Sequence, residues 1–169
     1  AAVACAASSP EETWFTAAFV VNRTDNPITV RMRWAGGDLD CDAIGGGDYA
    51  AKVAKAKGLK KWATCSPDYA YGRSNTAEFM EYAKHFDGNI RVVEEAWPKL
   101  FQPDYTEVVT KVLNAKPDAM YSALWGGDLV SFVEQANLYG MFSLDMNMFS
   151  TNMADPPIVQ ALKQVPEKV

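Results

Sequence analysis

The chain contains very few of the side chains that usually build a catalytic or metal site. Its 169 residues include a single histidine, His85, and three cysteines, Cys5, Cys41 and Cys65. One histidine near the end of a helix pattern offers no plausible serine or cysteine triad, and no cysteine has the spacing of a zinc ligand. We therefore expect a protein that is not an enzyme and that uses no metal or other cofactor.

Long apolar runs and an excess of positive charge are also missing. No stretch approaches the roughly 20 apolar residues that span a bilayer. The net charge is -5, which argues against a nucleic-acid partner because phosphate binding needs a concentrated basic face. The first residues, with Cys5 among alanines, are compatible with the end of a signal peptide or with a lipid-attachment cysteine.

From residue 27 onward the chain alternates between strand and helix patterns, whereas residues 1–26 show no clear period. Apolar segments predict strands at residues 28–34, 59–65, 90–97, 119–125 and 146–150. Amphipathic patterns predict helices at residues 49–57, 69–86, 126–140 and 157–164, with a further helix capped by Asp104. This order predicts one α/β domain over residues 27–169, with a doubly wound, mainly parallel sheet and helices on both faces.

Two motifs resemble ion-binding sites but lack residues that such sites need. The glycines at positions 45–47 precede a helix pattern, but they lack the Gly-Lys-Ser/Thr ending of a P-loop and the spacing of a dinucleotide fingerprint. A flexible turn is the better interpretation. Asp38, Asp40 and Asp42 resemble the start of a calcium loop, but the positions that need glycine and glutamate carry other residues.

Polar and aromatic side chains gather in the loops that follow three of the predicted strands. These loops carry Asp68, Tyr69 and Tyr71, then Trp125, Gly126, Gly127 and Asp128, then Ser150, Thr151 and Asn152. The carboxyl ends of parallel strands lie along one edge and face one crevice. Aromatic rings there supply flat walls, while hydroxyls, amides and glycine N–H groups fix a small polar ligand. The ligand-binding residues that we expect are Tyr69, Tyr71, Trp125, Gly126, Asp128, Ser150 and Thr151. The alternative is that Tyr71 and Trp125 are core residues at the edge of the sheet.

Four motifs follow one another along the chain: Tyr69-Ala-Tyr-Gly-Arg73, Trp97-Pro-Lys-Leu-Phe-Gln-Pro-Asp-Tyr105, Ala115-Lys-Pro-Asp118 and Leu124-Trp-Gly-Gly-Asp128. Together they resemble the type I periplasmic solute-binding proteins of branched-chain amino acid and amide ABC transporters. The resemblance covers about residues 27–169 and matches the carboxyl-terminal lobe. Within it, Val30-Arg-Met-Arg33 is similar to the strand that enters this lobe, and Val165-Pro-Glu-Lys-Val169 to the segment that leaves it.

The resemblance implies a non-catalytic receptor, periplasmic or extracellular, whose two lobes close on a solute and then dock on a membrane permease. The solute would be a branched-chain amino acid, an amide or a urea-like molecule. Tyr71 corresponds to the tyrosine of the family's Tyr-Gly motif, which walls the pocket. Trp125 and Gly126 correspond to the loop after the next-to-last strand, and Ser150 or Thr151 to a polar contact at the following strand end.

The chain departs from the family in its length. A complete member is about twice as long, and the first lobe is essentially absent, with Ser8-Ser9 as a possible remnant of one of its loops. We expect one lobe of a larger protein or an incomplete sequence, with the amino-terminal lobe as a missing partner. The alternative function is a flavodoxin-like regulatory or signalling domain that uses the same crevice, for which Asp68 and Asp128 are the only phosphoacceptor candidates.

Overall fold

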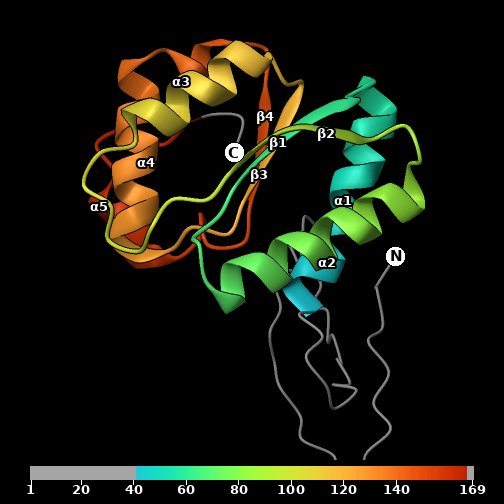
Figure 1. Ribbon diagram of the computed structural model, residues 1–169, viewed down its shortest axis with the longest axis horizontal. Helices are drawn as coiled ribbons and strands as arrows, with labels where there is room; N and C mark the ends of the chain where they lie inside the picture. Colours follow the sequence, from blue (N-terminus) through green and yellow to red (C-terminus); the bar gives the residue numbers. More distant parts are fainter. Residues whose placement is uncertain (1–40, 167–169) are drawn as a thin grey trace, which may run out of the picture.

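Four short parallel strands form the centre of the computed structural model, which describes residues 41–166 (Figure 1). The strands are β1 (Lys61–Cys65), β2 (Arg91–Ala96), β3 (Ala119–Ser122) and β4 (Asn147–Ser150). Their order in the sheet is β2-β1-β3-β4, and every neighbouring pair is parallel. All four residues of β3 are buried, as expected for a strand that is covered on both faces. The predicted α/β fold is confirmed.

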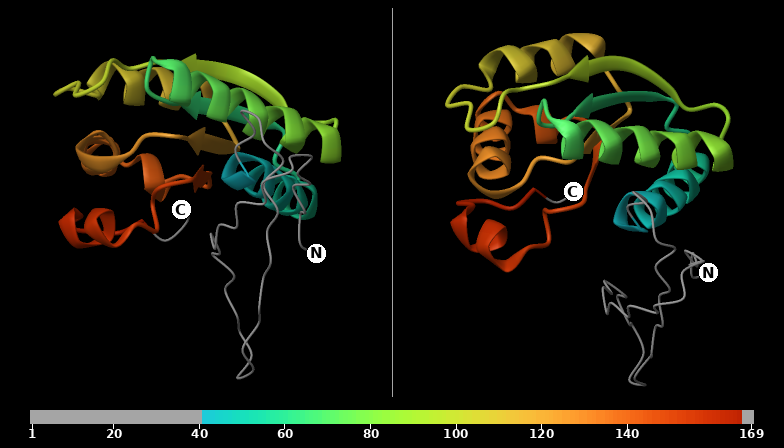
Figure 2. Two further views of the ribbon diagram at one scale, coloured as in Figure 1. Left: turned by 90° about the horizontal axis from the view of Figure 1, so that it is seen from below. Right: turned by 60° about the horizontal axis from the view of Figure 1, so that its bottom comes forward.

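Helices cover both faces of this sheet. They are α1 (Cys41–Lys57), α2 (Ala70–Phe86), α3 (Thr106–Ala115), α4 (Gly126–Leu138) and α5 (Pro156–Ala161), with a short 3-10 helix, η1, at Met141–Ser143. Figures 1 and 2 show α1 beside α2 on one side of the strands, and α3, α4 and α5 on the other. Helix α3 follows Asp104, but its N-cap residue is Tyr105, so the predicted cap is one residue too early. The Asp104 carboxylate still accepts a hydrogen bond from the Thr106 N–H at 2.8 Å.

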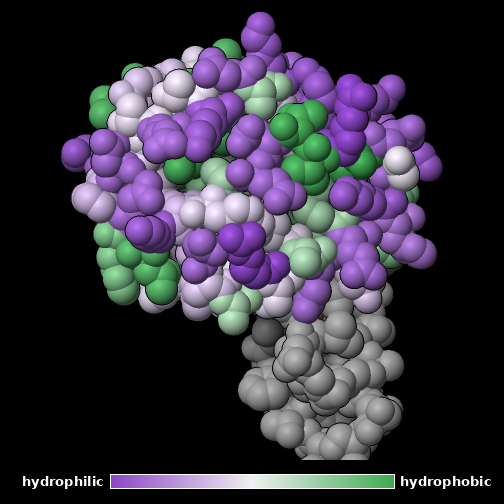
Figure 3. All heavy atoms as spheres, viewed as in Figure 1, coloured by the Kyte–Doolittle hydropathy of each residue, from purple (hydrophilic) through white to green (hydrophobic). Residues whose placement is uncertain are grey.

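Each face of the sheet carries its own hydrophobic cluster. On the side of α1 and α2, Phe79 stacks on Tyr121 with ring centroids 3.7 Å apart, and Trp62 stacks on Phe149 at 5.2 Å. The other cluster is mainly aliphatic and methionine-rich, with Met120 and Met148 of the sheet against α3, α4 and α5. Outside these clusters, the face seen in Figure 3 is mainly hydrophilic, with smaller hydrophobic groups between the polar side chains.

The glycines at positions 45–47 lie inside α1, so the predicted turn at these residues is wrong. The helix begins at Cys41 instead of residue 49, and the glycines let it approach α2 closely. A Cβ atom on Gly47 would stand 2.7 Å from the carbonyl oxygen of Phe79 and 3.0 Å from Cβ of Tyr82. Glycine is therefore required here by packing between two helices, although it lowers the intrinsic preference for a helix.

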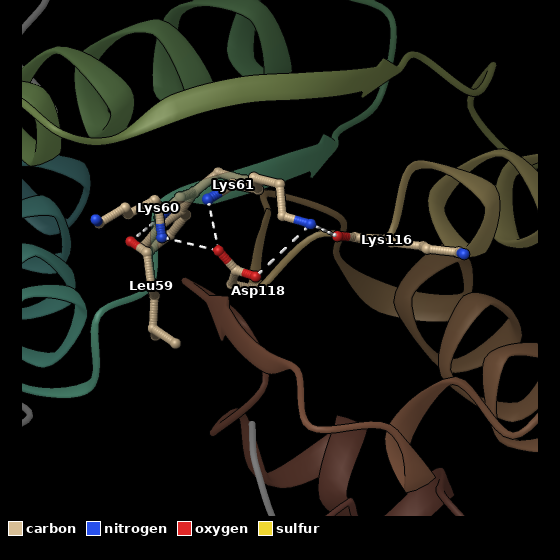
Figure 4. Close-up of polar contacts among 6 residues, drawn as sticks. Leu59, Lys60, Lys61, Lys116 and Asp118 are labelled. Carbon is tan, nitrogen blue, oxygen red and sulfur yellow. Dashed lines mark hydrogen bonds and ion pairs between the residues drawn. The ribbon is translucent and has the colours of Figure 1, made fainter.

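Asp118 joins the starts of β1 and β3 at the amino edge of the sheet (Figure 4). Its Oδ2 atom accepts hydrogen bonds from the backbone N–H groups of Lys60 at 2.9 Å and Lys61 at 2.8 Å. The Lys61 ammonium lies 3.9 Å from Asp118 Oδ1 and donates to the carbonyl oxygen of Lys116 at 2.7 Å. Partial burial alone would raise the pKa of Asp118, but these two N–H donors and the Lys61 and Arg91 cations lower it overall.

Several expectations concern residues 1–40 and 167–169, which lie outside the described part of the chain. They include the strand at 28–34, the possible loop remnant at Ser8-Ser9, the lipid-attachment cysteine at Cys5, and the carboxylates of Asp38 and Asp40. Among the helices of residues 41–166, none combines the length and the apolar character that a membrane crossing requires. The same residues bring together no three side chains of the His, Cys, Asp and Glu types that could hold a metal ion.

Candidate ligand-binding site

A hollow of about 430 Å³ lies at the carboxyl edge of the sheet, where the loops after β1, β3 and β4 meet. We call it the carboxyl-edge hollow. Its lining residues are Tyr69, Tyr71, Trp125, Gly126, Asn152, Asp155, Pro157 and Ile158. Open α/β sheets bind ligands at this edge, because the loops that leave parallel strands converge there.

The loop between β1 and α2 turns sharply, and Gly72 makes the turn possible. A Cβ atom on Gly72 would stand 2.1 Å from the carbonyl oxygen of Pro67, so no other residue fits at this position. The turn is closed by a hydrogen bond from the Tyr69 N–H to Pro67 O at 2.8 Å. Tyr71 and Gly72 therefore act together: the glycine lets the chain turn back against Pro67, and this turn places Tyr71 in the first turn of α2.

Asp68 and Arg73 brace the same loop from outside the hollow. Arg73 donates to Asp68 Oδ1 through Nε at 2.9 Å and through Nη2 at 2.6 Å. Its guanidinium group also lies 3.9 Å from the centre of the Trp97 ring, within the range of a cation–π contact. The Asp68 carboxylate and the Arg73 guanidinium are therefore paired with each other, and neither side chain lines the hollow.

Tyr69, Tyr71 and Trp125 form an aromatic wall on one side of the hollow. The rings of Tyr69 and Tyr71 lie 5.9 Å apart, and the indole N–H of Trp125 donates to the Tyr69 hydroxyl at 3.1 Å. Trp125 is 41% exposed, so the core does not enclose its side chain. The wall combines side chains from the loops after β1 and β3, so it depends on the parallel arrangement of these strands.

Asn152 connects the loop after β4 to the other two loops. Its side-chain amide donates to the carbonyl oxygen of Leu124 at 3.0 Å and lies 3.4 Å from the Tyr71 hydroxyl oxygen. The same amide nitrogen is 3.2 Å from Thr151 Oγ1. One side chain therefore fixes the relative positions of all three loops around the hollow.

The start of α5 also lines the hollow. Pro157 and Ile158 supply apolar surface, and Asp155 is the only charged residue among those that line the hollow. Asp155 precedes α5, yet its carboxylate makes no hydrogen bond to the helix backbone. Within the described residues this carboxylate has no hydrogen-bond or ion-pair partner.

The structure brings together four of the seven predicted site residues, Tyr69, Tyr71, Trp125 and Gly126. Ser150 and Thr151 lie next to the hollow without lining it, and their hydroxyl oxygens face the Asn152 backbone N–H and side-chain amide. Asp128 is buried, and its carboxylate accepts a hydrogen bond from the Phe101 N–H at 2.9 Å.

Asn152 was expected in the loop after β4 but not as a ligand contact, and three further lining residues were not anticipated from the sequence: Asp155, Pro157 and Ile158. The available signal was a helix start, Asp-Pro-Pro, only a few residues after the last strand. A helix that begins so close to a strand end must lie at the same edge of the sheet as the other loops.

Two buried groups near this edge have strongly shifted acidities. Burial raises the pKa of the Cys65 thiol, and burial together with the nearby Asp128 carboxylate raises the pKa of Tyr105. Neither side chain lines the hollow. Its surface therefore consists of aromatic rings, hydroxyls, an amide and one carboxylate, a set of groups suited to binding a small molecule.

Comparison with known proteins gives a family-level match. A family model described as periplasmic binding protein matches residues 32–166. No curated protein sequence matches the chain.

Solved structures add neighbours with the same fold. A solute-binding protein of an ABC transporter from Rhodopseudomonas palustris BisB5, in complex with 3,4-dihydroxybenzoic acid, is 32% identical with a TM-score of 0.56, and the match covers 64% of this chain and 28% of that one. A second R. palustris solute-binding protein, in complex with 4-hydroxybenzoate, is 25% identical with a TM-score of 0.56, covering 64% and 29%.

A periplasmic ligand-binding protein of a branched-chain amino acid ABC transporter from Burkholderia xenovorans LB400 is 18% identical. Its TM-score is 0.54, and the match covers 64% of this chain and 28% of that one. This likeness concerns the fold alone. The part of the chain that matches spans less than a third of the length of each of these three solved proteins.

Proposed function

The chain belongs to the periplasmic binding protein family, and on this premise we propose that it is a non-catalytic solute receptor of an ABC uptake system. In this proposal the described residues are one lobe of the receptor, and the carboxyl-edge hollow is this lobe's share of the ligand site. The receptor works in the periplasm or outside the cell and delivers its solute to a membrane permease.

The observation that carries the proposal is the aromatic wall. Three aromatic side chains from two separate loops meet at one hollow, and the Trp125 indole is hydrogen-bonded to the Tyr69 hydroxyl at 3.1 Å. Such a wall offers a large, rigid contact surface to a small molecule, because each ring has only two side-chain torsions to fix. The exposed part of the Trp125 side chain leaves its ring available to a ligand in the hollow.

The proposed mechanism is closure of two lobes around the ligand. A ligand that touches both lobes stabilises the closed state relative to the open state by the contacts it makes only there. The lobe described here supplies one wall and one carboxylate, and a second lobe would supply the remaining contacts. The chain by itself should therefore bind its ligand weakly.

The ligand classes in this proposal have two sources. The family resemblance points to a branched-chain amino acid, an amide or a urea-like molecule. The two R. palustris neighbours were solved with hydroxylated benzoates, which adds aromatic carboxylates to the candidates. Apolar rings and a few polar groups are compatible with all of these molecules.

The alternative, a regulatory domain that accepts a phosphoryl group, has less support. A phosphoacceptor aspartate must be available to its substrate. Asp68 is paired with Arg73 at 2.6 Å, and Asp128 is buried against the Phe101 N–H. Both carboxylates thus have structural partners.

Nuclear magnetic resonance tests the proposed function on the chain as it stands. We expect that at least one member of a panel of branched-chain amino acids, amides, urea and benzoates shifts the indole resonance of Trp125 at millimolar concentration. The indole of Trp62, which is 0% exposed in the core, serves as the internal control. The proposal would be wrong if no solute of the panel moved Trp125, or if each solute moved Trp62 equally.

A further inference from the structure

We propose that the carboxyl-edge hollow recognises the hydroxyl-bearing end of a hydroxylated aromatic carboxylate, and that the carboxylate of this ligand points away from the lobe. The inference rests on the proposed function and goes further, because it selects one ligand class and fixes its orientation. Three features of the hollow carry it: the flat walls, the hydroxyl groups of the two tyrosines, and the unpaired carboxylate of Asp155.

The walls of the hollow favour a planar ring. The aromatic wall of Tyr69, Tyr71 and Trp125 stands on one side, and Pro157 and Ile158 supply apolar surface from α5. Aromatic groups gain a specific attraction from offset stacking or edge-to-face contact with other rings. A branched aliphatic side chain would lose this contribution, because it has no ring face to offer.

The two tyrosine hydroxyls have hydrogen atoms left for a ligand. A phenolic hydroxyl can accept hydrogen bonds and can donate one. Tyr69 Oη accepts from the Trp125 indole at 3.1 Å, and Tyr71 Oη faces the Asn152 amide nitrogen at 3.4 Å. In the described part of the chain neither O–H has an acceptor, so both are available to donate to an oxygen atom in the hollow.

Asp155 adds an acceptor to the same hollow. Its carboxylate lines the hollow and has no partner among the described residues. A ligand hydroxyl is complementary to both kinds of group, because it can donate to Asp155 and accept from a tyrosine. An ammonium group could donate to Asp155, but it has no lone pair with which to accept from a tyrosine.

The same carboxylate determines which way the ligand faces. Among the residues that line the hollow there is no lysine, arginine or histidine. The nearby Arg73 is held by Asp68 at 2.6 Å and lies on the Trp97 ring. A ligand carboxylate placed beside Asp155 would be repelled without compensation. It therefore faces the second lobe or solvent, with the hydroxyl end inside this lobe.

Saturation-transfer NMR on the chain measures this orientation directly. With 4-hydroxybenzoate as the probe, we expect stronger saturation of the two ring protons next to the hydroxyl than of the two next to the carboxylate. We also expect 4-hydroxybenzoate to bind about tenfold more tightly than benzoate, as a hydrogen bond to a charged group predicts. Stronger saturation beside the carboxylate, or equal affinity for the two acids, would overturn the inference.

A variant tests the role of Asp155. In Asp155→Asn the shape is kept and the charge removed, so the preference for 4-hydroxybenzoate over benzoate should fall from about tenfold to about twofold or less. Asp104→Asn is the matched control, because Asp104 also precedes a helix but lies outside the hollow. An unchanged preference in Asp155→Asn, with the Trp62 indole resonance as a check of folding, would contradict the proposal.

The outcomes also separate this inference from the proposed function. If leucine or an amide shifts the Trp125 indole and 4-hydroxybenzoate does not, the receptor function stands and the ligand class is wrong. If no solute shifts Trp125, both proposals fail together.

Discussion

The buried carboxylate of Asp128 accepts a hydrogen bond from the backbone N–H of Phe101 at 2.9 Å, across 27 positions of the chain. Phe101 has a φ of 59°, in the left-handed region that costs a residue with a side chain about 1 kcal/mol or more. The first turn of α4 thus holds the loop between β2 and α3 in an unfavourable conformation. The Leu-Trp-Gly-Gly-Asp motif therefore has two parts, an aromatic residue at the hollow and an acid that fixes a neighbouring loop.

We expect Asp128→Ala to lower the free energy of unfolding by about 1–3 kcal/mol, since it leaves the Phe101 N–H without its acceptor. Asp128→Asn should cost less, because the amide oxygen can still accept. Urea denaturation measures both. The Asn variant should bind solutes as the unmodified chain does, and a loss of binding at unchanged stability would place Asp128 among the ligand contacts.

Gly47→Ala should destabilise the protein by about 1–3 kcal/mol, because the new methyl group overlaps Phe79 O at 2.7 Å and forces α1 away from α2. The intrinsic helix preference alone predicts the opposite, a gain of up to about 1 kcal/mol. Gly127→Ala is the matched control, since a Cβ atom there meets nothing within 4 Å. Thermal unfolding of the two variants shows whether the close packing of α1 on α2 or the helix propensity of alanine has the larger effect. A stabilised Gly47→Ala would show that the helices are not in close contact.

Asp118 should make the stability depend on pH in the acid range. Its pKa is lower in the folded protein than its usual value of 3.8, so the ionised form stabilises the fold at neutral pH. This contribution is complete above the pKa of the unfolded chain and is lost as the pH falls through the lower pKa of the folded state. The stability difference between the unmodified chain and Asp118→Asn should therefore shrink between pH 5 and about pH 2. Urea denaturation at several pH values would contradict this if the difference stayed constant.

Trp125→Ala should weaken solute binding about threefold to tenfold, as expected for the loss of one stacking contact. Stability should change little, because 41% of the Trp125 side chain is already exposed. Leu138→Ala is a suitable control, since Leu138 is 85% exposed and does not line the hollow. An NMR titration that gives the same affinity for Trp125→Ala would assign this residue to the edge of the core.

The regular part of the fold could be predicted from the sequence because strand and helix periods are local properties. The segment from Ala119 is free of charged residues up to Gly127, and it forms the buried strand β3 followed by its loop. The glycines at 45–47 misled the prediction for the opposite reason. A glycine-rich stretch indicates a turn when it is considered alone, and only the partner helix α2 explains why it is helical.

The candidate site was predictable to the extent that it depends on strand ends. Tyr71 and Trp125 lie at the starts of the helices that follow β1 and β3, so the parallel sheet alone places them at one edge. Asp155 precedes α5 and Ile158 lies within it, and the sequence pattern of this helix does not show in which direction it runs across the edge. The sequence could not show that Asp128 differs from the lining residues, because it does not reveal the hydrogen bond from the Phe101 N–H to the Asp128 carboxylate.

The cluster around Asp118 and the carboxyl-edge hollow stand at opposite ends of the same strands. Lys61 begins β1 beside Asp118, and the loop with Tyr69 and Tyr71 follows the end of β1. Side chains at one end can therefore be exchanged without disturbing the hydrogen bonds at the other. A library that varies positions 69, 125 and 155 should yield mostly folded lobes, which makes this scaffold a practical starting point for sensors of new solutes.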